Sequence, residues 1–191
     1  MNTDLLNLTL VEAQEGILKK RFSSEELTTA CISSSKAWHS SINAFVKIDE
    51  EDALISARKA DSELSKNNVL GILHGIPLAH KDLFFLENKP ISCGSKVLDG
   101  FTANYDATII KKLHNQAGAI NVGRLNMAEI AVGASGRNEH FGHCRNPWNT
   151  AHMTGGSSSG SGAAVAARNI FGSLGTDTGG SVRIPSSACG L

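Results

Sequence analysis

Two glycine-rich stretches decide the fold of this sequence: TGGSSSGSGAAVAA at residues 154–167, which is also rich in serine, and GTDTGGSVRIP at residues 175–185. The first is typical of a loop that runs into a helix of small residues, because serine and glycine favour turns and alanine favours helix. The second is typical of a loop that ends in a serine. Between them, residues 171–174 favour a short strand. The two loops are therefore expected to lie on either side of one short strand.

Upstream of these loops, the sequence alternates short strands with helices. Residues 73–82 mix an apolar strand with glycine and proline, which places Lys81 at or just after a strand end. Residues 105–116 favour a helix and residues 119–122 a buried strand. This order predicts an α/β fold with a mixed β-sheet flanked by helices. Residues 126–132 favour a short helix, and residues 135–154 a loop rich in Asn, His and Gly.

The N-terminal part of the chain is predicted to be mainly helical. Thr9 is a good N-cap for a helix over residues 9–20, and Ser23 with Glu26 has the spacing of a capping box that opens a second helix. Residues 43–49 favour a strand, and Asp49 can cap a charged helix to about Ser65. The buried stripe of the second helix is expected at Leu27, Ala30, Cys31, Ser34 and Trp38. We expect residues 1–70 to form a helical segment and residues 71–191 the catalytic core segment of one domain.

Composition and charge narrow the class of protein. The chain has 191 residues, of which 41% are hydrophobic, so it can bury a core and disorder is not expected. Lys plus Arg and Asp plus Glu both number 18, which argues against nucleic acid or an anionic membrane as a partner and favours a small neutral or zwitterionic substrate. Four scattered cysteines and no signal-peptide pattern favour reduced thiols and a cytoplasmic protein.

The second loop can supply a nucleophile and an anion-binding concavity. Consecutive backbone N–H groups of Thr178, Gly179, Gly180 and Ser181 can converge there, because glycine has no Cβ in the way. Ser181 would attack a carbonyl from the rim of this oxyanion hole.

A serine nucleophile needs a general base, and histidine is the usual one. No histidine follows His152, although an earlier histidine could fold back. Lys81 is the more attractive candidate, because burial can lower the pKa of a lysine so that its neutral amine accepts a proton. Ser157 could relay the proton, since a hydroxyl both donates and accepts.

The motifs GGSSSGSGAAVAA and GTDTGGSVRIP, preceded by HGIPLAHKD at residues 74–82, closely resemble those of the amidase signature family. The resemblance runs from about Leu10 to the last residue. It implies a Ser–cis-Ser–Lys triad with Ser181 as nucleophile, Ser157 as bridging serine and Lys81 as base. The implied activity is hydrolysis of a carboxylic amide through an acyl-enzyme, without a cofactor or a metal.

Three further residues are expected to support this site. Asp177 and Arg183 fall on family positions, where they are expected to hold the nucleophile loop by hydrogen bonds and an ion pair, and Ser158 neighbours the bridging serine.

Within the family, the stretch before the triad is more similar to stand-alone amidases than to the glutamine-hydrolysing subunit of the tRNA-dependent amidotransferase. That subunit usually reads SSGGS where this chain has Ser157-Ser-Ser-Gly-Ser161. The departure favours a stand-alone amidase, which could form a homo-oligomer. The amidotransferase subunit, which would act with partner subunits, remains the alternative.

Other short motifs compete with this interpretation. Residues 156–160 match the G-x-S-x-G elbow with Ser158 as nucleophile, but no apolar strand precedes them. Ser33 to Lys36 match the S-x-x-K motif of β-lactamases, but the partner motifs of β-lactamases are missing. His140, His143 and Cys144 resemble metal ligands in type, yet a loop at the active-site entrance is the preferred interpretation.

The chain stops at Leu191, directly after the functional loop and without a polar tail. We therefore expect a domain truncated on its C-terminal side, and a catalytically inactive fragment is a further alternative.

Overall fold

The structure is a computed structural model, and it describes residues 5–191. The first four residues of the expected N-terminal segment lie outside the described residues. The strands are β1 (Phe45–Ile48), β2 (Pro77–Lys81), β3 (Ile120–Leu125) and β4 (Ser173–Leu174). The α-helices are α1 (Leu10–Leu18), α2 (Ser24–Ile42), α3 (Glu50–Ser65), α4 (Thr108–Ile110), α5 (Ser159–Ala166) and α6 (Arg183–Cys189). Short 3-10 turns lie at Leu5–Asn7, Lys96–Leu98 and Glu129–Ala131, and a π-helical segment, η3, spans Lys111–Gln116.

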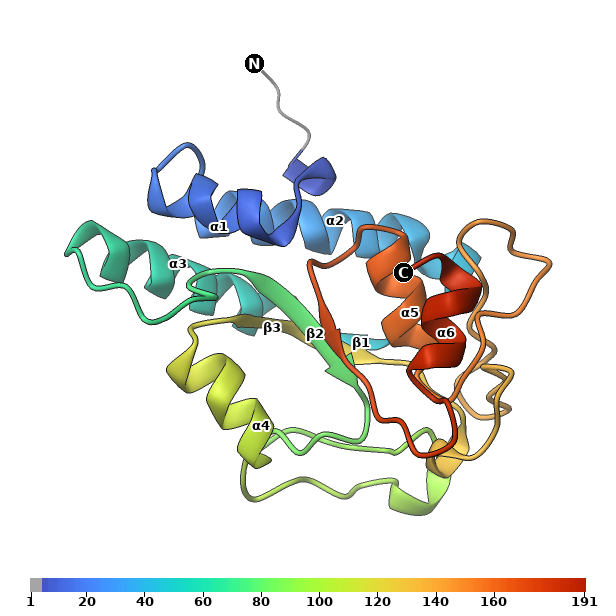
Figure 1. The fold of residues 1–191 in the computed structure, drawn as a ribbon. Coiled ribbons are helices and arrows are strands. Elements are labelled where there is room, and N and C mark those ends of the chain that lie inside the picture. The colour runs from blue at the N-terminus through green and yellow to red at the C-terminus, as the bar shows by residue number, and fades with distance from the viewer. Residues whose placement is uncertain (1–4) are drawn as a thin grey trace.

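The strands form one mixed sheet with the order β1-β3-β2-β4. β1 runs antiparallel to β3, whereas β2 runs parallel to both β3 and β4. Helices α1 and α2 lie above the sheet in Figure 1 and α4 lies below it. The expected α/β fold with a mixed sheet flanked by helices is confirmed. Because β1 pairs with β3, the segments 1–70 and 71–191 share one sheet.

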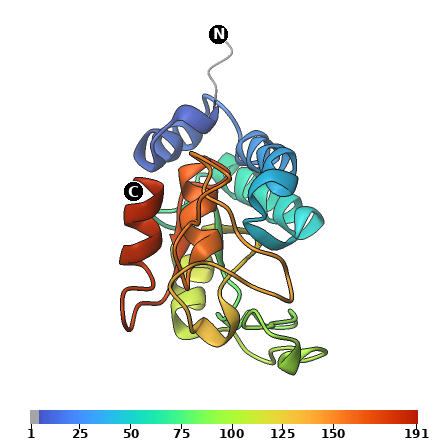
Figure 2. The ribbon, with the colours of Figure 1, turned by 90° about the vertical axis from the view of Figure 1, so that its right-hand side faces the viewer.

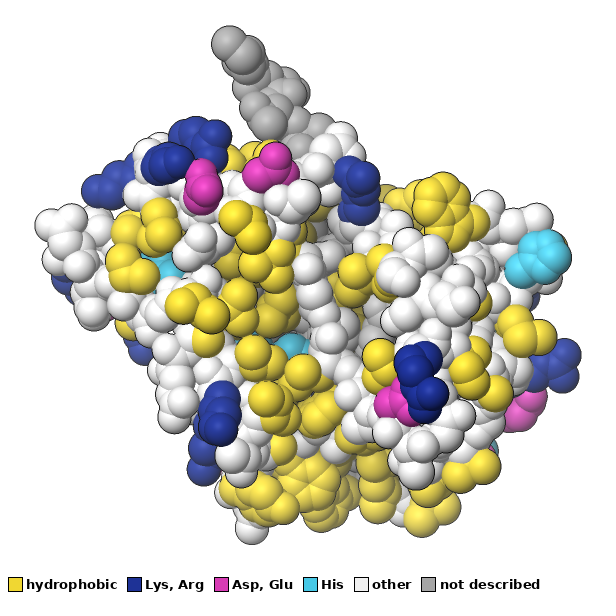
Figure 3. Space-filling view, in the orientation of Figure 1, with side chains coloured by type: hydrophobic (Ala, Val, Ile, Leu, Met, Phe, Trp, Pro, Cys, Tyr) yellow, Lys and Arg dark blue, Asp and Glu magenta, His cyan; other side chains and the backbone are white. Residues whose placement is uncertain are grey.

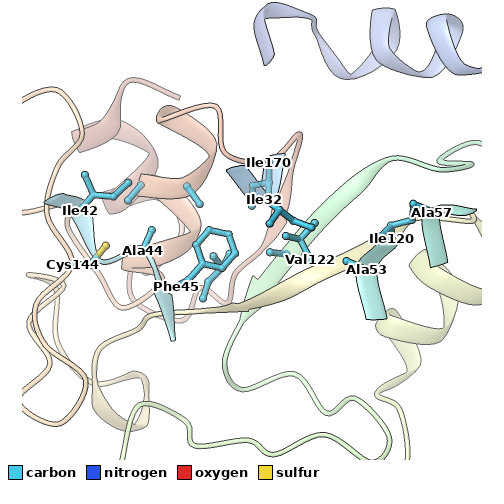
Figure 4. Packing of buried hydrophobic residues seen from close by; sticks show 14 residues of the cluster. Ile32, Ile42, Ala44, Phe45, Ala53, Ala57, Ile120, Val122, Cys144 and Ile170 are labelled. Atoms are coloured by element: carbon cyan, nitrogen blue, oxygen red, sulfur yellow. The ribbon is translucent and has the colours of Figure 1, made fainter. Parts of the chain in front are cut away.

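The main hydrophobic core lies between the sheet and the helices that cover it. Phe45 of β1 and Val122 of β3 meet Ile32 of α2 and Ala163 of α5 in one buried cluster (Figure 4). Helix α5 also packs against β2, β4 and α6 (Figure 2). Burial of these apolar side chains is the main favourable contribution to the stability of the fold. The core therefore anchors α5 against the sheet.

The helix starts follow from local capping. Thr9 and Glu12 form a capping box at α1, and Ser23 and Glu26 form one at α2, so both expected N-termini are confirmed. The predicted buried stripe of α2 is wrong at Trp38, which is 38% exposed. Residues 36 to 41 of α2 are all exposed, so this part of the helix has no buried stripe.

The start of α3 differs from the prediction in its chemistry. Asp49 precedes α3, as expected, but its side chain makes no capping hydrogen bond. One carboxylate oxygen of Asp49 instead lies 3.9 Å from Lys89 Nζ. The acidic residues of the first turn of α3 still favour this helix terminus, because they lie at the positive end of the helix dipole.

Two secondary-structure predictions near the site are wrong, one of a helix and one of a loop. Residues 126–132 form only a 3-10 turn, because Ile130 and Ala131 both have positive φ angles, which an α-helix cannot continue through. The 175–185 stretch is predicted to be a loop throughout, but α6 begins at Arg183. Pro185 fits there because the first helical turn does not use its missing N–H.

Hydrophobic side chains gather in a band down the middle of the surface in Figure 3, while charged side chains lie mainly toward its margins. Within residues 5–191, no helix is long and apolar enough to cross a membrane.

Candidate active site

Lys81 is the last residue of β2, and its side chain is almost completely buried. The whole strand is buried, and Lys81 itself is 1% exposed. Its Nζ donates to Ser157 Oγ at 2.7 Å and contacts Thr176 Oγ1 at 2.8 Å. The structure thus brings Lys81 and Ser157 together from positions 76 residues apart. A buried amine with two hydroxyl partners is equipped to exchange protons with them.

Ser157 lies in the buried turn that leads into α5. The Gly156–Ser157 peptide bond is cis, as the family resemblance implied, and the Ser157 side chain is fully buried. The Ser157 carbonyl accepts a hydrogen bond from the Ala128 N–H at 3.0 Å. Both the backbone and the hydroxyl of Ser157 are therefore held by neighbouring residues.

The position of this turn depends on close backbone packing at Gly160. A Cβ at Gly160 would come within 2.3 Å of the Ala44 carbonyl oxygen and 2.5 Å of the Asn126 nitrogen. The Gly160 N–H donates to the Asn126 carbonyl at 2.8 Å. Only glycine permits this approach, which brings the N-terminus of α5, and with it Ser157, against the ends of β1 and β3.

Burial controls the protonation of Lys81. Removal of the ammonium group from water lowers the pKa of Lys81 from 10.5 to about 8. The Cys93 thiolate, where it forms, and the Asp177 carboxylate act in the opposite direction and favour the charged amine. Neutral Lys81 is therefore far more accessible near neutral pH than the neutral form of a solvent-exposed lysine.

The loop that carries Ser181 is organised around the Asp177 carboxylate. Asp177 accepts hydrogen bonds from the backbone N–H groups of Gly180, Val182 and Arg183, at 2.7 to 3.1 Å. The Arg183 guanidinium adds two more, at 2.9 and 3.1 Å, which form a bidentate ion pair. The Arg183 side chain, followed by the backbone N–H groups, lowers the pKa of Asp177. Asp177 thus fixes the turn on both sides of Ser181.

Ser181 is attached to the buried turn through its backbone. Its carbonyl accepts from the Ser158 N–H at 3.2 Å, and its side chain is half-buried. Across residues 5–191, no hydrogen bond joins Ser181 Oγ to Ser157 Oγ or to Lys81 Nζ. The structure places the loop of Ser181 beside the Lys81–Ser157 pair without a direct contact of the hydroxyl.

The four backbone N–H groups expected to form an oxyanion hole differ in their bonding. The Gly180 N–H already donates to Asp177. Those of Thr178, Gly179 and Ser181 have no hydrogen-bond partner among the described residues. These three groups are therefore the ones available to an added anion.

Thr176 is a site residue that sequence reasoning missed. It follows β4 by two residues, and its hydroxyl contacts Lys81. Its backbone N–H and carbonyl both lie 3.3 Å from Ser158 Oγ, so Ser158 links the two loops. The sequence carries no signal for this contact, because it depends on the pairing of the two-residue β4 with β2.

Ser158 does not occupy a strand-to-helix elbow. The residues before it form turns and an isolated bridge between Arg145 and Met153, not a hydrophobic strand. The rejection of the elbow motif therefore agrees with the observed backbone.

The histidine-rich loop does not assemble a metal site within residues 5–191. His140 Nε2 lies 2.9 Å from Glu129 Oε1, His143 pairs with the Asn138 backbone, and Cys144 is buried in the core. These three side chains thus have separate surroundings.

Comparison with known families adds a direct finding. The family model described as Amidase matches residues 26–191 of this chain. Among curated proteins, the chain is similar to one subunit of the glutamyl-tRNA(Gln) amidotransferase of Pseudomonas entomophila, with 48% identity over 184 residues. The same subunit of Coxiella burnetii is 46% identical over 183 residues. Each match covers 96% of this chain, which spans 38% of the length of these relatives.

Solved structures share the fold. A structure described as a vestigial protein complex that reveals the origins of an s-triazine catabolic enzyme has a TM-score of 0.93 and 39% identity, and the match covers 96% of this chain and 40% of that one. Peptide amidase from Stenotrophomonas maltophilia has a TM-score of 0.88 and 32% identity, with 94% and 38% covered. Relatives of both kinds considered above, amidases and amidotransferase subunits, are thus similar to this chain.

Proposed function

This chain belongs to the amidase signature family, and from that premise we propose that it supplies the catalytic Ser–Ser–Lys triad of an amide hydrolase. Ser181 is the nucleophile, Ser157 the bridging serine and Lys81 the base. The observation that carries the proposal is the 2.7 Å hydrogen bond between the buried Lys81 amine and Ser157 Oγ. Lysine is rarely buried without a charged partner, and a buried amine with a lowered pKa beside a serine hydroxyl is typical of a functional site.

The proposed reaction begins with proton transfer. Neutral Lys81 accepts the Ser157 hydroxyl proton as Ser157 accepts that of Ser181, whose oxygen attacks the amide carbonyl. The relay then returns the proton to the departing amine, so that ammonia or an amine leaves and an acyl-enzyme remains. Water, deprotonated by the same relay, hydrolyses the ester to the carboxylic acid and frees Ser181.

The Ser181 hydroxyl does not yet reach Ser157 in this structure. Catalytic hydrogen bonds in apo structures are often long and tighten when substrate binds. The Ser181 carbonyl accepts from the Ser158 N–H, which supports a reorientation of the Ser181 side chain on a held backbone.

The developing oxyanion would be bound by the N–H groups of Thr178, Gly179 and Ser181. Loss of one such donor costs about 3–4 kcal/mol of transition-state stabilisation in enzymes of this kind. Gly180 has the indirect role of holding Asp177, because its N–H is already used.

We also infer the cellular location and the substrate class. The four cysteines are free thiols, which supports a cytoplasmic location. The equal numbers of acidic and basic residues support a neutral or zwitterionic amide.

A fluorophosphonate probe tests the triad, because it forms an adduct only with an activated serine. We expect a Ser181 adduct, located by peptide mapping, that disappears in Ser181→Ala and falls at least a hundredfold in rate in Lys81→Ala. The matched controls are Ser187→Ala and Lys96→Ala, two exposed residues that should label normally. If Lys81→Ala is folded and labels at the wild-type rate, Lys81 is not the base. If Ser181 is never labelled, the chain is a catalytically inactive member of the family.

A second candidate function is glutamine hydrolysis for a tRNA-dependent amidotransferase. The observation in its favour is the 46–48% identity to curated amidotransferase subunits. Release of ammonia from glutamine only in the presence of partner subunits would support it. Hydrolysis of simple amides by the chain without a partner would favour the stand-alone amidase.

A further inference from the structure

A pair of histidines lies directly behind the candidate base, and the proposed mechanism does not use it. His80 precedes Lys81 in β2 and is 1% exposed, and His114 belongs to η3. The two Nε2 atoms are 2.8 Å apart, and the ring planes meet edge to face at 68°. Only one of two facing imidazole nitrogens can carry a proton at this distance, so the contact has a direction.

The surrounding groups fix that direction. His114 Nδ1 lies 2.9 Å from the Ala119 carbonyl oxygen, which can only accept, so His114 Nδ1 carries the proton. In a neutral ring His114 Nε2 is then bare and accepts from His80 Nε2–H. His80 Nδ1 is left as an acceptor, and the Leu174 N–H donates to it at 3.2 Å. The chain of hydrogen bonds is complete only when both rings are neutral.

The environment favours these neutral forms. Burial, followed by the charge of its neighbour, lowers the pKa of His80 to about 3, and burial lowers the pKa of His114. The groups that face the pair are the Phe84 ring on the His80 side and the Asp106 carboxylate on the His114 side. Asp106 favours a charged His114, but burial outweighs it.

The hydrogen bonds of the histidine pair end at β4, the strand that leads to Thr176. β4 has only two residues and pairs with β2 at Ala79↔Ser173 and His80↔Leu174. The imidazole of His80 therefore supplies one of the few attachments of β4 to β2. Two residues after Leu174, Thr176 contacts the Lys81 amine.

We propose that His80 is a positioning residue, which holds β4 through the Leu174 N–H and so keeps Thr176 within reach of Lys81. His114 fixes the tautomer that makes this possible. Side chains of consecutive strand residues point to opposite faces, so His80 acts through the backbone and does not touch substrate. The catalytic meaning of this role rests on the proposed function of Lys81.

Matched substitutions at His80 separate the two hydrogen bonds of its ring. The amide of His80→Asn can place an acceptor near the Nδ1 position and keep the Leu174 contact. The longer amide of His80→Gln can place a donor near the Nε2 position and keep the His114 contact, but it leaves the Leu174 N–H unpaired. His80→Leu removes both, and His39→Asn, at an exposed histidine, is the control.

Three measurements on the full chain test the positioning role of His80. Nitrogen-15 NMR of the imidazoles should show the Nε2–H tautomer for His80 and the Nδ1–H tautomer for His114. The titration of Lys81, followed by NMR of its side chain, should be unchanged in His80→Asn. In His80→Gln the Lys81 pKa should move further below the ordinary lysine value, because the ammonium group loses Thr176 as an acceptor. The rate of Ser181 labelling should stay within about threefold in His80→Asn and fall about tenfold or more in His80→Gln, because small misplacements of a catalytic group are costly.

The proposal is overturned if His80 carries its proton on Nδ1. It is also overturned if folded His80→Gln leaves the Lys81 titration as it is in the wild type. These NMR readouts do not need a reactive Ser181. If the wild type fails to label while they follow the expected order, the proposed function fails and the positioning role stands. Should His80→Leu not fold, the Asn and Gln variants decide the matter.

Discussion

The two glycine-rich stretches, residues 154–167 and residues 175–185, have opposite environments. Residues 154–164 are buried without exception, and the turn and helix they form pack directly on the strand ends. In the second stretch Asp177, Thr178 and Gly179 are exposed, and the turn is held by one carboxylate. Composition thus predicts irregular backbone in both stretches but not what stabilises it. The first is held by packing and the second by hydrogen bonds.

This difference divides the proposed chemistry. The base Lys81 and the bridging Ser157 belong to the packed part, where burial tunes the amine. The nucleophile Ser181 belongs to the hydrogen-bonded loop, where a substrate can reach it. Substitutions in the first stretch should therefore affect folding, and substitutions in the second should affect reactivity.

One added methyl group in each stretch tests this difference most directly. In Gly160→Ala the added Cβ meets backbone atoms at 2.3 and 2.5 Å, and we expect a loss of about 3 kcal/mol in the free energy of unfolding. In Gly179→Ala nothing lies within 4 Å of the new atom, and the change should stay within about 0.5 kcal/mol. Urea denaturation measures both. Equal effects at the two sites would remove the distinction.

The next prediction concerns the free energy of unfolding, which the burial of Lys81 lowers. The Lys81 pKa is lowered from 10.5 to about 8 in the folded protein, so between these pH values the unfolded chain binds one more proton at this site than the folded chain. The contribution of Lys81 to the free energy of unfolding therefore rises with pH from 8 to 10.5. Lys81→Met lacks this dependence. Its stability relative to the wild type should therefore fall by about 1–3 kcal/mol from pH 8 to pH 10.5.

Denaturant unfolding of both proteins at pH 7, 8 and 10 measures this difference, in which the other lysines cancel. A difference that does not change with pH would show that the folded structure leaves the Lys81 pKa at its ordinary value.

On the loop side, removal of the Asp177 carboxylate should change reactivity more than stability. Asp177→Ala leaves three backbone N–H groups and Arg183 without their acceptor, so Ser181 labelling should fall about tenfold or more. Asp177→Asn, which keeps one acceptor oxygen, should lie between this variant and the wild type. Comparison of labelling rates with melting temperatures separates the two effects. A parallel loss of both would mean that the loop is part of the folding core.

The pH dependence of this loop has a definite sign. The lowered pKa of Asp177 means that its contribution is present above the ordinary carboxyl pKa and is lost only as pH falls through the lower folded value.

The smallest effect is expected at the end of the packed stretch. Arg168 follows α5 with φ of 54°, a left-handed conformation that glycine adopts more easily. Arg168→Gly should therefore raise the free energy of unfolding by up to about 1 kcal/mol. Loss of the hydrogen bond between the Arg168 and Asn7 side chains reduces this gain. Arg168→Ala, which cannot relieve the backbone, is the control. A destabilised glycine variant would show that the Asn7 contact matters more.

Much of the fold was predictable because its signals are local. Ser23 and Glu26 lie three residues apart, so their capping box can be read directly, and the short apolar run before Lys81 predicts a strand end. The failures have non-local causes. Residues 126–132 do not form a helix because Ile130 and Ala131 have positive φ angles, and the Ile130 N–H donates to the distant Cys93 carbonyl instead of to its own turn.

The candidate site shows the same limit. The motifs gave Lys81, Ser157 and Ser181 by family resemblance. Thr176 was missed because its role depends on the pairing of β4 with β2, and strand order is not written in a two-residue strand. The Gly180 N–H was placed among the free donors, since no sequence pattern shows that Asp177 already uses it.

The close approach of α5 to the strand ends has a consequence for how such a protein can diverge. At Gly160 there is no space for even a methyl group, so a descendant sequence can change there only if the backbone moves as well. Ile130 and Val132, by contrast, are 53% and 77% exposed and can be exchanged at small cost. Close-packed positions such as Gly160 and exposed positions such as Ile130 can thus change independently of one another. A lineage could therefore exchange such exposed side chains many times while the geometry around Lys81 stays the same.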